Sequence, residues 1–158
     1  MDFKFFYGVD DEINIIKNTL GKINYYNEHS YRILLPKNFD VKNNNIEYIR
    51  KAVLDEYNGG EYKEISMFLE NKVEENMAKI KSGFDKTDFI IEDTYNIYLT
   101  KYGVGGSYNP LNSIILNFKA KEKEKLFKTI IHETIHLCIN KLIIKYNIPQ
   151  WEKELLVD

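Results

Sequence analysis

The strongest constraint on the fold is a run of two histidines around a glutamate, His132-Glu133-Thr134-Ile135-His136. Residues four apart lie on the same face of an α-helix. His132 and His136 can therefore reach one ion at the roughly 2.0–2.1 Å that zinc requires of nitrogen ligands. Glu133 projects about a third of a turn away, where a carboxylate can serve as a general base beside that ion. The run therefore predicts a helix that carries a zinc site.

The residues on both sides of this run are largely apolar, with residues 129–131 before it and 137–139 after it. A helix with this pattern holds its histidines in a largely buried place. Buried polar groups need partners, and one metal ion would satisfy both imidazoles. The alternative interpretation, a surface turn with two solvated histidines, fits the apolar flanks less well.

Catalytic zinc usually takes three protein ligands, and the sequence offers few further candidates. We expect His29 to be a solvated loop residue. Cys138 follows His136 by two positions and so projects to the opposite side of the helix, where we expect it to pack as a small apolar residue. Asn147 and Pro149 predict a turn after which a second helix runs back alongside the first.

The returning segment contains Glu152, Glu154 and Asp158. The helix from His136 to Tyr146 is about 15 Å long, whereas Glu154 lies about 7–8 Å and Asp158 about 13 Å along the second helix. With side-chain reach, Glu154 can approach the histidines and Glu152 falls short. These distances along the two helices do not match perfectly, so either the first helix ends before Tyr146 or the two helices cross at an angle.

The segment His132-Glu-Thr-Ile-His136 followed by Glu154-Leu-Leu-Val-Asp158 resembles the gluzincin metallopeptidases, the thermolysin-like group, over roughly residues 96–158. The resemblance implies that Glu154 is the third ligand of one Zn²⁺ ion and that Asp158 hydrogen-bonds and orients His132. Such contacts fix the tautomer of a ligand histidine.

The same resemblance implies a zincin-like fold and the hydrolysis of a peptide or protein substrate, with Glu133 as the catalytic base. In that family an edge strand before the metal helix binds the extended substrate by β-augmentation, and residues 113–118 would be this strand. The family often has asparagine before the ligand glutamate, where this chain has Lys153. Larger members supply an oxyanion-stabilising tyrosine or histidine from a C-terminal subdomain; Tyr108 and Tyr146 are the nearest candidates here.

The rest of the pattern predicts an α+β fold, with a small mixed β-sheet, a long metal helix and a short C-terminal ligand helix in one zincin-like domain over residues 1–158. Apolar residues recur at helical spacing through much of the first half of the chain and again around the metal-binding run. Strand-like patterns and one glycine-rich loop, residues 103–110, separate these helices. The predicted helices cover residues 10–21, 46–57 and 65–80, and the predicted strands are residues 31–35, 89–92, 96–102 and 113–118, with residues 3–7 either a strand or a docked arm.

Composition limits the partners. With 158 residues and a net charge of -2, the chain has no electrostatic footprint for nucleic acid. It has no apolar run of membrane-spanning length, so we expect no membrane partner. The N-terminus lacks a signal-peptide pattern, and the one cysteine excludes an internal disulfide framework, so we expect a cytoplasmic protein. The oligomeric state stays open.

Two functions remain open at this point. The first is a zinc metallopeptidase, in which an open coordination position beside a cleft is required. The second is a catalytically silent zincin-fold binding or regulatory domain with a structural zinc, in which the fourth position is closed. The retained Glu133 favours the enzyme, because a purely structural site needs no base.

Overall fold

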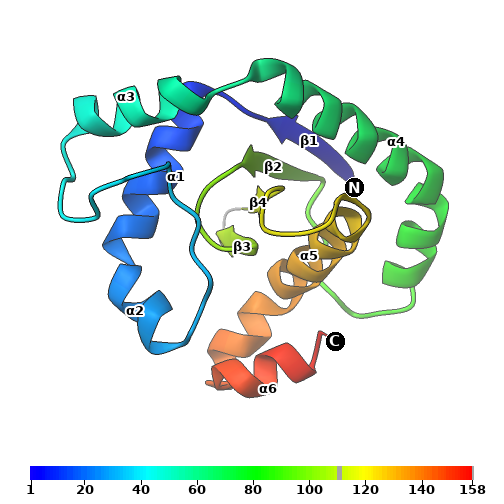
Figure 1. Cartoon of the computed structure of the whole chain (residues 1–158). Coiled ribbons are helices and arrows are strands. Elements are labelled where there is room, and N and C mark those ends of the chain that lie inside the picture. Colours follow the sequence, from blue (N-terminus) through cyan, green and yellow to red (C-terminus); the bar gives the residue numbers. More distant parts are fainter. Residues whose placement is uncertain (110–111, 158) are drawn as a thin grey trace.

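The computed structural model describes residues 1–109 and 112–157, and this part of the chain contains six helices and one four-stranded sheet (Figure 1). The predicted α+β class is therefore confirmed. None of the helices in these two ranges combines the length and the apolar character that crossing a lipid bilayer demands.

The sheet is mixed and places its strands in the order β1-β2-β4-β3. β2 pairs in parallel with both β1 and β4, whereas β3 pairs antiparallel with β4 and forms one edge. The predicted strand at residues 113–118 is confirmed as β4, but its predicted place at the edge is wrong. The strands are β1 (Asp2–Phe6), β2 (Thr94–Thr100), β3 (Gly106–Asn109) and β4 (Ser113–Asn117).

The reason for this correction lies in the glycine-rich segment expected to be a loop. Its second half forms β3, which pairs with β4 from Gly106 opposite Leu116 to Asn109 opposite Ser113. β4 therefore lies between β2 and β3, and β3 takes the edge position.

Two other strand predictions are also wrong. Residues 31–35 contribute only an isolated bridge between Leu34 and Gly103, and residues 89–92 join no strand of the sheet described here. Both segments are short apolar runs, for which periodicity alone does not determine strand pairing. Residues 3–7, by contrast, do enter the sheet, as β1.

The helices lie where apolar residues at helical spacing predicted them, except that α2 was not predicted. The helix predicted over residues 10–21 is present, and so is the long helix that carries both histidines. The six are α1 (Val9–Gly21), α2 (Ile23–Glu28), α3 (Ile46–Glu56), α4 (Gly59–Phe84), α5 (Lys123–Lys145) and α6 (Gln150–Leu155).

The main core lies between one face of the sheet and the apolar sides of α4 and α5. Tyr95, Ile97 and Leu99 alternate along β2 and are fully buried, as are Ile114 and Leu116 of β4. Burial of one such aliphatic side chain stabilises the fold by about 1.5–3 kcal/mol. This packing fixes α5, which also contacts β3.

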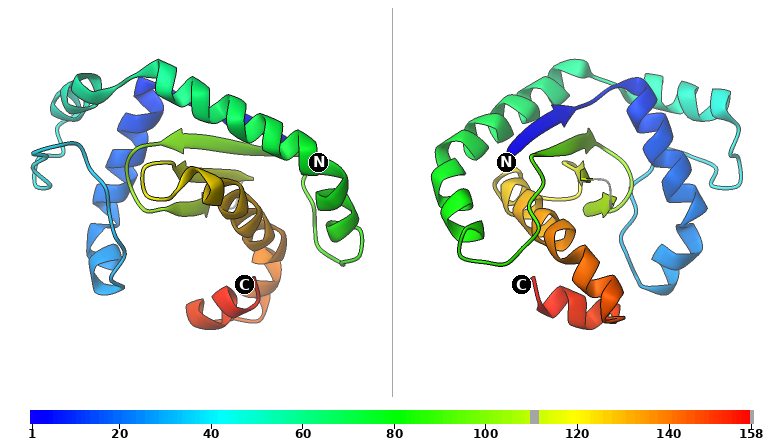
Figure 2. Two further views of the ribbon diagram at one scale, coloured as in Figure 1. Left: turned by 45° about the vertical axis from the view of Figure 1, so that its right-hand side comes forward. Right: turned by 180° about the vertical axis from the view of Figure 1, so that it is seen from behind.

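The N-terminal helices are held beside the carboxyl ends of β1 and β2 (Figure 2). Glu12 of α1 is fully buried and accepts hydrogen bonds from the hydroxyls of Tyr62 and Thr100. It also accepts a hydrogen bond of 3.0 Å from the backbone N–H of Lys101. The Glu12 carboxyl group thus links α1 to α4 and to the end of β2.

Candidate metal centre

The two histidines of the sequence pattern lie one turn apart on α5 and face the same way. Their Nε2 atoms are 3.0 Å apart, and their ring centroids are separated by 4.6 Å. His136 is buried, with 2% of its surface exposed, and His132 is partly exposed. Helix geometry alone produces this pairing, because residues i and i+4 lie above one another.

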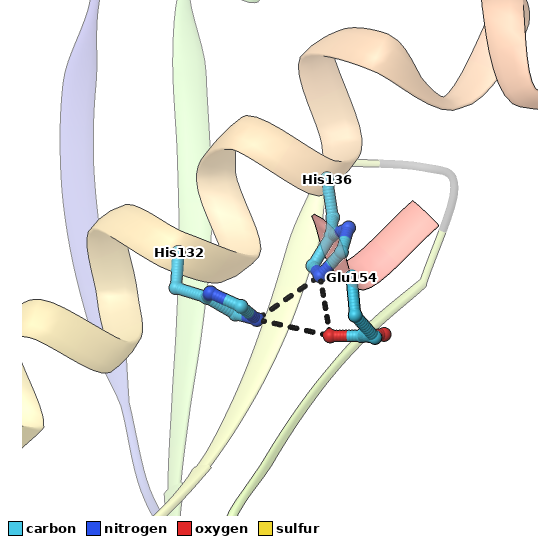
Figure 3. Close-up of side chains that lie close together, drawn as sticks. All are labelled: His132, His136 and Glu154. Carbon is cyan, nitrogen blue, oxygen red and sulfur yellow. Dashed lines mark hydrogen bonds and ion pairs between the residues drawn. The ribbon is translucent and has the colours of Figure 1, made fainter. Parts of the chain in front are cut away.

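A tight turn brings the third side chain to the histidines. Asn147 takes the left-handed conformation (φ 50°), as expected after the last residue of a helix, and Pro149 precedes α6. Glu154 of α6 then points back at α5 (Figure 3). Its Oε2 atom lies 3.4 Å from Nε2 of His132 and 3.3 Å from Nε2 of His136.

The structure thus brings His132, His136 and Glu154 together in a group that could hold a metal ion. Their potential ligand atoms all lie within 4.8 Å of one another. Glu152, which the sequence placed out of reach, is exposed and is not part of this group. Asp158, the predicted orienting residue, lies outside the described residues.

The other two ligand candidates lie away from the donor group. The Nδ1 atom of His29 lies 2.8 Å from the backbone oxygen of Tyr25 at an exposed position. Cys138 is buried in the core, where its sulfur lies 3.2 Å from the Tyr95 hydroxyl. Both positions agree with the roles expected for these residues, a solvated histidine and a packed thiol.

Glu133 is held beside the donor group in a buried position, with 8% of its surface exposed. Burial raises the pKa of its carboxyl to about 7, while the nearby Lys121 ammonium opposes that rise. The backbone of Gly106 in β3 lies so close that a Cβ atom there would stand 2.8 Å from Oε1 of Glu133. Glycine is therefore required for the edge strand to approach this carboxylate.

Burial has the opposite effect on His136, whose pKa it lowers to about 4. The imidazole is therefore neutral near pH 7, which is the form that binds metals. Within the described part of the chain, its buried Nδ1 atom has no hydrogen-bond partner. Only Nε2 of this ring takes part in the donor group.

These residues lie in a cleft of about 540 Å³. Residues 105–108 form one wall, and α5 and α6 form the floor around the three donors. The facing wall comes from α2 and the adjoining residues, with the rings of Tyr25, Tyr26 and Tyr31. The cleft therefore joins segments that are about a hundred residues apart in the sequence.

The two tyrosines proposed from the sequence have different positions. Tyr108 lines the cleft, and its ring stacks on His136 with a centroid distance of 5.5 Å. Its hydroxyl donates to Oδ1 of Asn140 at 3.4 Å, further along α5. The structure does not bring Tyr146 to the cleft: this residue follows α5, is 63% exposed and lies against the ammonium of Lys145.

Sequence reasoning missed several residues of this cleft. Lys121 and Lys153 both line the cleft. In the sequence, however, Lys121 lies in a run of mixed charges that is typical of the solvated end of a helix. Gly105 and Gly106 gave a usable clue, because adjacent glycines often mark a close backbone approach. Nothing in the local sequence pointed to the tyrosines of the facing wall.

Comparison with known proteins gave no match to a family model, a curated protein or a solved structure. The gluzincin resemblance therefore depends on the motif residues alone.

Proposed function

We propose that this chain is a zinc-dependent metallopeptidase of the gluzincin type with a zincin-like fold. One observation carries the proposal. The donor atoms of His132, His136 and Glu154 converge at the floor of a cleft, next to the buried carboxyl group of Glu133.

The spacing of the donors approaches that of a tetrahedral zinc site, with the two histidine nitrogens slightly closer together. Three donors that bind one zinc ion at 2.0–2.2 Å with tetrahedral angles lie roughly 3.3–3.5 Å apart. The three separations in this group are 3.0, 3.3 and 3.4 Å. Two imidazoles and one carboxylate are also a ligand set of catalytic zinc sites, which keep a fourth position for water or substrate.

The division of roles follows from the positions of the side chains. A zinc ion held by the three donors would polarise a substrate carbonyl and lower the pKa of a bound water. Glu133 would accept a proton from the attacking water while the water oxygen bonds to the carbonyl carbon. The same carboxyl would then give the proton to the amide nitrogen as the C–N bond breaks, yielding an acid and an amine.

The edge strand supports a peptide as the substrate. β3 lies at the end of the sheet order, lines the cleft and has no second partner strand within the described residues. An extended peptide can pair with such an edge through its backbone. β3, rather than the predicted strand at residues 113–118, would align the scissile bond with the donor group.

One observation favours the alternative, a catalytically silent binding or regulatory domain with a structural zinc. The hydroxyl of Tyr108, the nearest candidate for contact with the oxyanion, donates to Asn140. A domain of this kind would bind zinc and hydrolyse no peptide. The two functions therefore differ in a direct assay.

The test combines metal analysis with peptide hydrolysis. We expect one zinc per chain, cleavage of a peptide library that a chelator abolishes, and recovery when zinc is restored. Glu133→Gln should keep its zinc and lose about 10²–10⁴-fold in rate, the usual effect of a general base. Glu124→Gln, at an exposed position in the first turn of α5, is the matched control. Full activity of zinc-loaded Glu133→Gln would overturn the mechanism.

A further inference from the structure

The charge of the cleft differs from the charge of the whole chain. The protein has 24 acidic and 22 basic side chains. Among the described residues that line the cleft, however, three are lysines, Lys22, Lys121 and Lys153. The carboxylates in that lining are Glu133 and Glu154, both of which belong to the proposed metal chemistry. A bound dication would add to the positive charge that an incoming substrate meets.

Lys121 lies at one end of the edge strand. Its side chain runs so close to Gly105 that a Cβ atom there would stand 2.9 Å from its Cε. Its ammonium donates to Oγ1 of Thr129 at 3.0 Å, one helical turn before Glu133. This hydrogen bond holds the charge at the level where β3 begins.

Lys153 lies further along the same strand. Its ammonium is 4.8 Å from the centre of the Tyr108 ring and 3.9 Å from Oε1 of Glu154. Only 12% of its side chain is exposed. The position is therefore set by a cation–π contact and an ion pair rather than by free motion in solvent.

The two lysines lie at different levels along the donor group, because β3 and α5 run in the same direction past each other. Gly106 lies against Thr129 and Glu133, and Tyr108 lies against His136 and Asn140. The span from residue 105 to residue 108 is about 10 Å in an extended strand. A peptide lying along this edge would thus meet one ammonium group on each side of the bond at the metal.

We propose that the substrate of this cleft is an acidic peptide, an extended segment with Asp or Glu side chains on both sides of the scissile bond. This inference rests on the proposed peptidase function. Lys121 and Lys153 are its specificity-determining residues, and Lys22 on the facing wall adds a third positive charge that steers acidic chains to the cleft.

The test uses the zinc-loaded full chain and three versions of one peptide, with Glu, Gln or Lys at the two positions that flank the cleaved bond. Charge pairs that water partly screens contribute about threefold each. We therefore expect kcat/KM for the Glu peptide to exceed that for the Gln peptide by roughly tenfold. The ratio should shrink at high salt, because ions screen these charges. Lys121→Glu should reduce or reverse the preference, whereas Lys63→Glu, at an exposed position on α4, should leave it unchanged.

Binding separates this inference from the peptidase function. Fluorescence anisotropy of the labelled peptides with zinc-loaded Glu133→Gln should show the same order of affinity, with the Glu peptide bound most tightly and the Lys peptide most weakly. Acid-selective binding without cleavage by the parent would support the substrate class and overturn hydrolysis. Equal rates and equal affinities for the three peptides would overturn the substrate class and leave hydrolysis standing. Tighter binding of a single-stranded oligonucleotide than of the Glu peptide would also overturn the proposal of an acidic peptide substrate.

Discussion

Burial acts in opposite directions on two neighbouring residues of α5. It raises the pKa of Glu133 to about 7 and lowers the pKa of His136 to about 4, because a low-dielectric site disfavours whichever form is charged. The histidine is thus kept neutral, which is the form of imidazole that binds metals. A dication bound at the donor group would favour the glutamate's carboxylate form by Coulomb attraction.

Gly106 gives a prediction at the scale of one residue. In Gly106→Ala, the new methyl group would stand 2.7 Å from Cγ2 of Thr129 and 2.8 Å from Oε1 of Glu133. Both neighbours are buried, so we expect a loss of about 1–3 kcal/mol in the free energy of unfolding, as for other overpacked sites. Urea denaturation of the variant and the parent measures this loss.

Gly83→Ala is the matched control, because a Cβ atom at this helical position in α4 meets nothing within 4 Å. Alanine there should leave the stability unchanged or raise it by up to about 1 kcal/mol. Equal stabilities of Gly106→Ala and the parent would show that the edge strand does not pack against Glu133 as described.

At the scale of elements, α6 and the donor group depend on each other. α6 spans Gln150–Leu155, which is too short to be stable as an isolated helix. Trp151 and Leu155 are largely exposed, so core packing on this side of α6 is slight. The contacts of Lys153 and Glu154 with Tyr108 and the histidines hold it against α5 and β3.

Zinc bound at the proposed site should therefore stabilise the fold through α6. At a free zinc concentration 100 times the dissociation constant, binding contributes about 2.7 kcal/mol, or roughly 5–10 °C in melting temperature for a chain of this size. In Glu154→Gln we expect most of this zinc-dependent shift to be lost. The measurement is a thermal melt with zinc and with chelator.

Glu152→Gln is the control for this melt, since Glu152 is an exposed residue on the same short helix. It should keep the full zinc-dependent shift. Equal shifts in Glu154→Gln and the parent would mean that Glu154 is not a ligand.

The elements were predictable to different degrees. Helices could be predicted from apolar residues at helical spacing, because each residue bonds within its own segment. The strands were harder: β3 was expected to be a loop, since Gly106 and Ser107 carry no strand pattern. Its pairing with β4 depends on the opposing Leu116 and Ile115, which local composition does not reveal.

At the scale of the whole molecule, Glu12 is the buried group that joins distant parts of the chain. Its partners Tyr62 and Thr100 lie 50 and 88 positions away. Burial raises the pKa of the Glu12 carboxyl, although hydrogen bonds from its partners oppose the rise. The folded protein therefore binds this proton more tightly than the unfolded chain does.

The sign of the pH dependence follows from that difference. The stabilisation by the Glu12 proton is fully present below the ordinary carboxyl pKa of 4.5. It is lost as the pH rises through the higher pKa of the folded state, because the unfolded chain has already released its proton. In Glu12→Gln this loss should disappear, so the difference in free energy of unfolding between parent and variant should change as the pH rises above 4.5.

Urea denaturation at several pH values measures this difference. Glu28→Gln, at an exposed position at the end of α2, serves as the control and should leave the pH profile of the parent unchanged. Parallel profiles for Glu12→Gln and the parent would contradict the link between burial of Glu12 and stability.

The sequence by itself determined the parts of the centre that depend on local geometry. The spacing of His132 and His136 places both imidazoles on one helix face, and Asn147 with Pro149 predicts the turn that returns Glu154. These relations need only hydrogen bonds within a few residues. The class of the fold followed for the same reason, from helical and strand periodicity.

Only the tertiary structure decided what surrounds that centre. The approach of Gly106 to Glu133, the edge position of β3 and the facing wall of tyrosines all join segments far apart in the chain. β1 itself pairs with β2 from Asp2 opposite Thr94. Such contacts depend on which surfaces pack together across the whole domain, and no local periodicity encodes that choice.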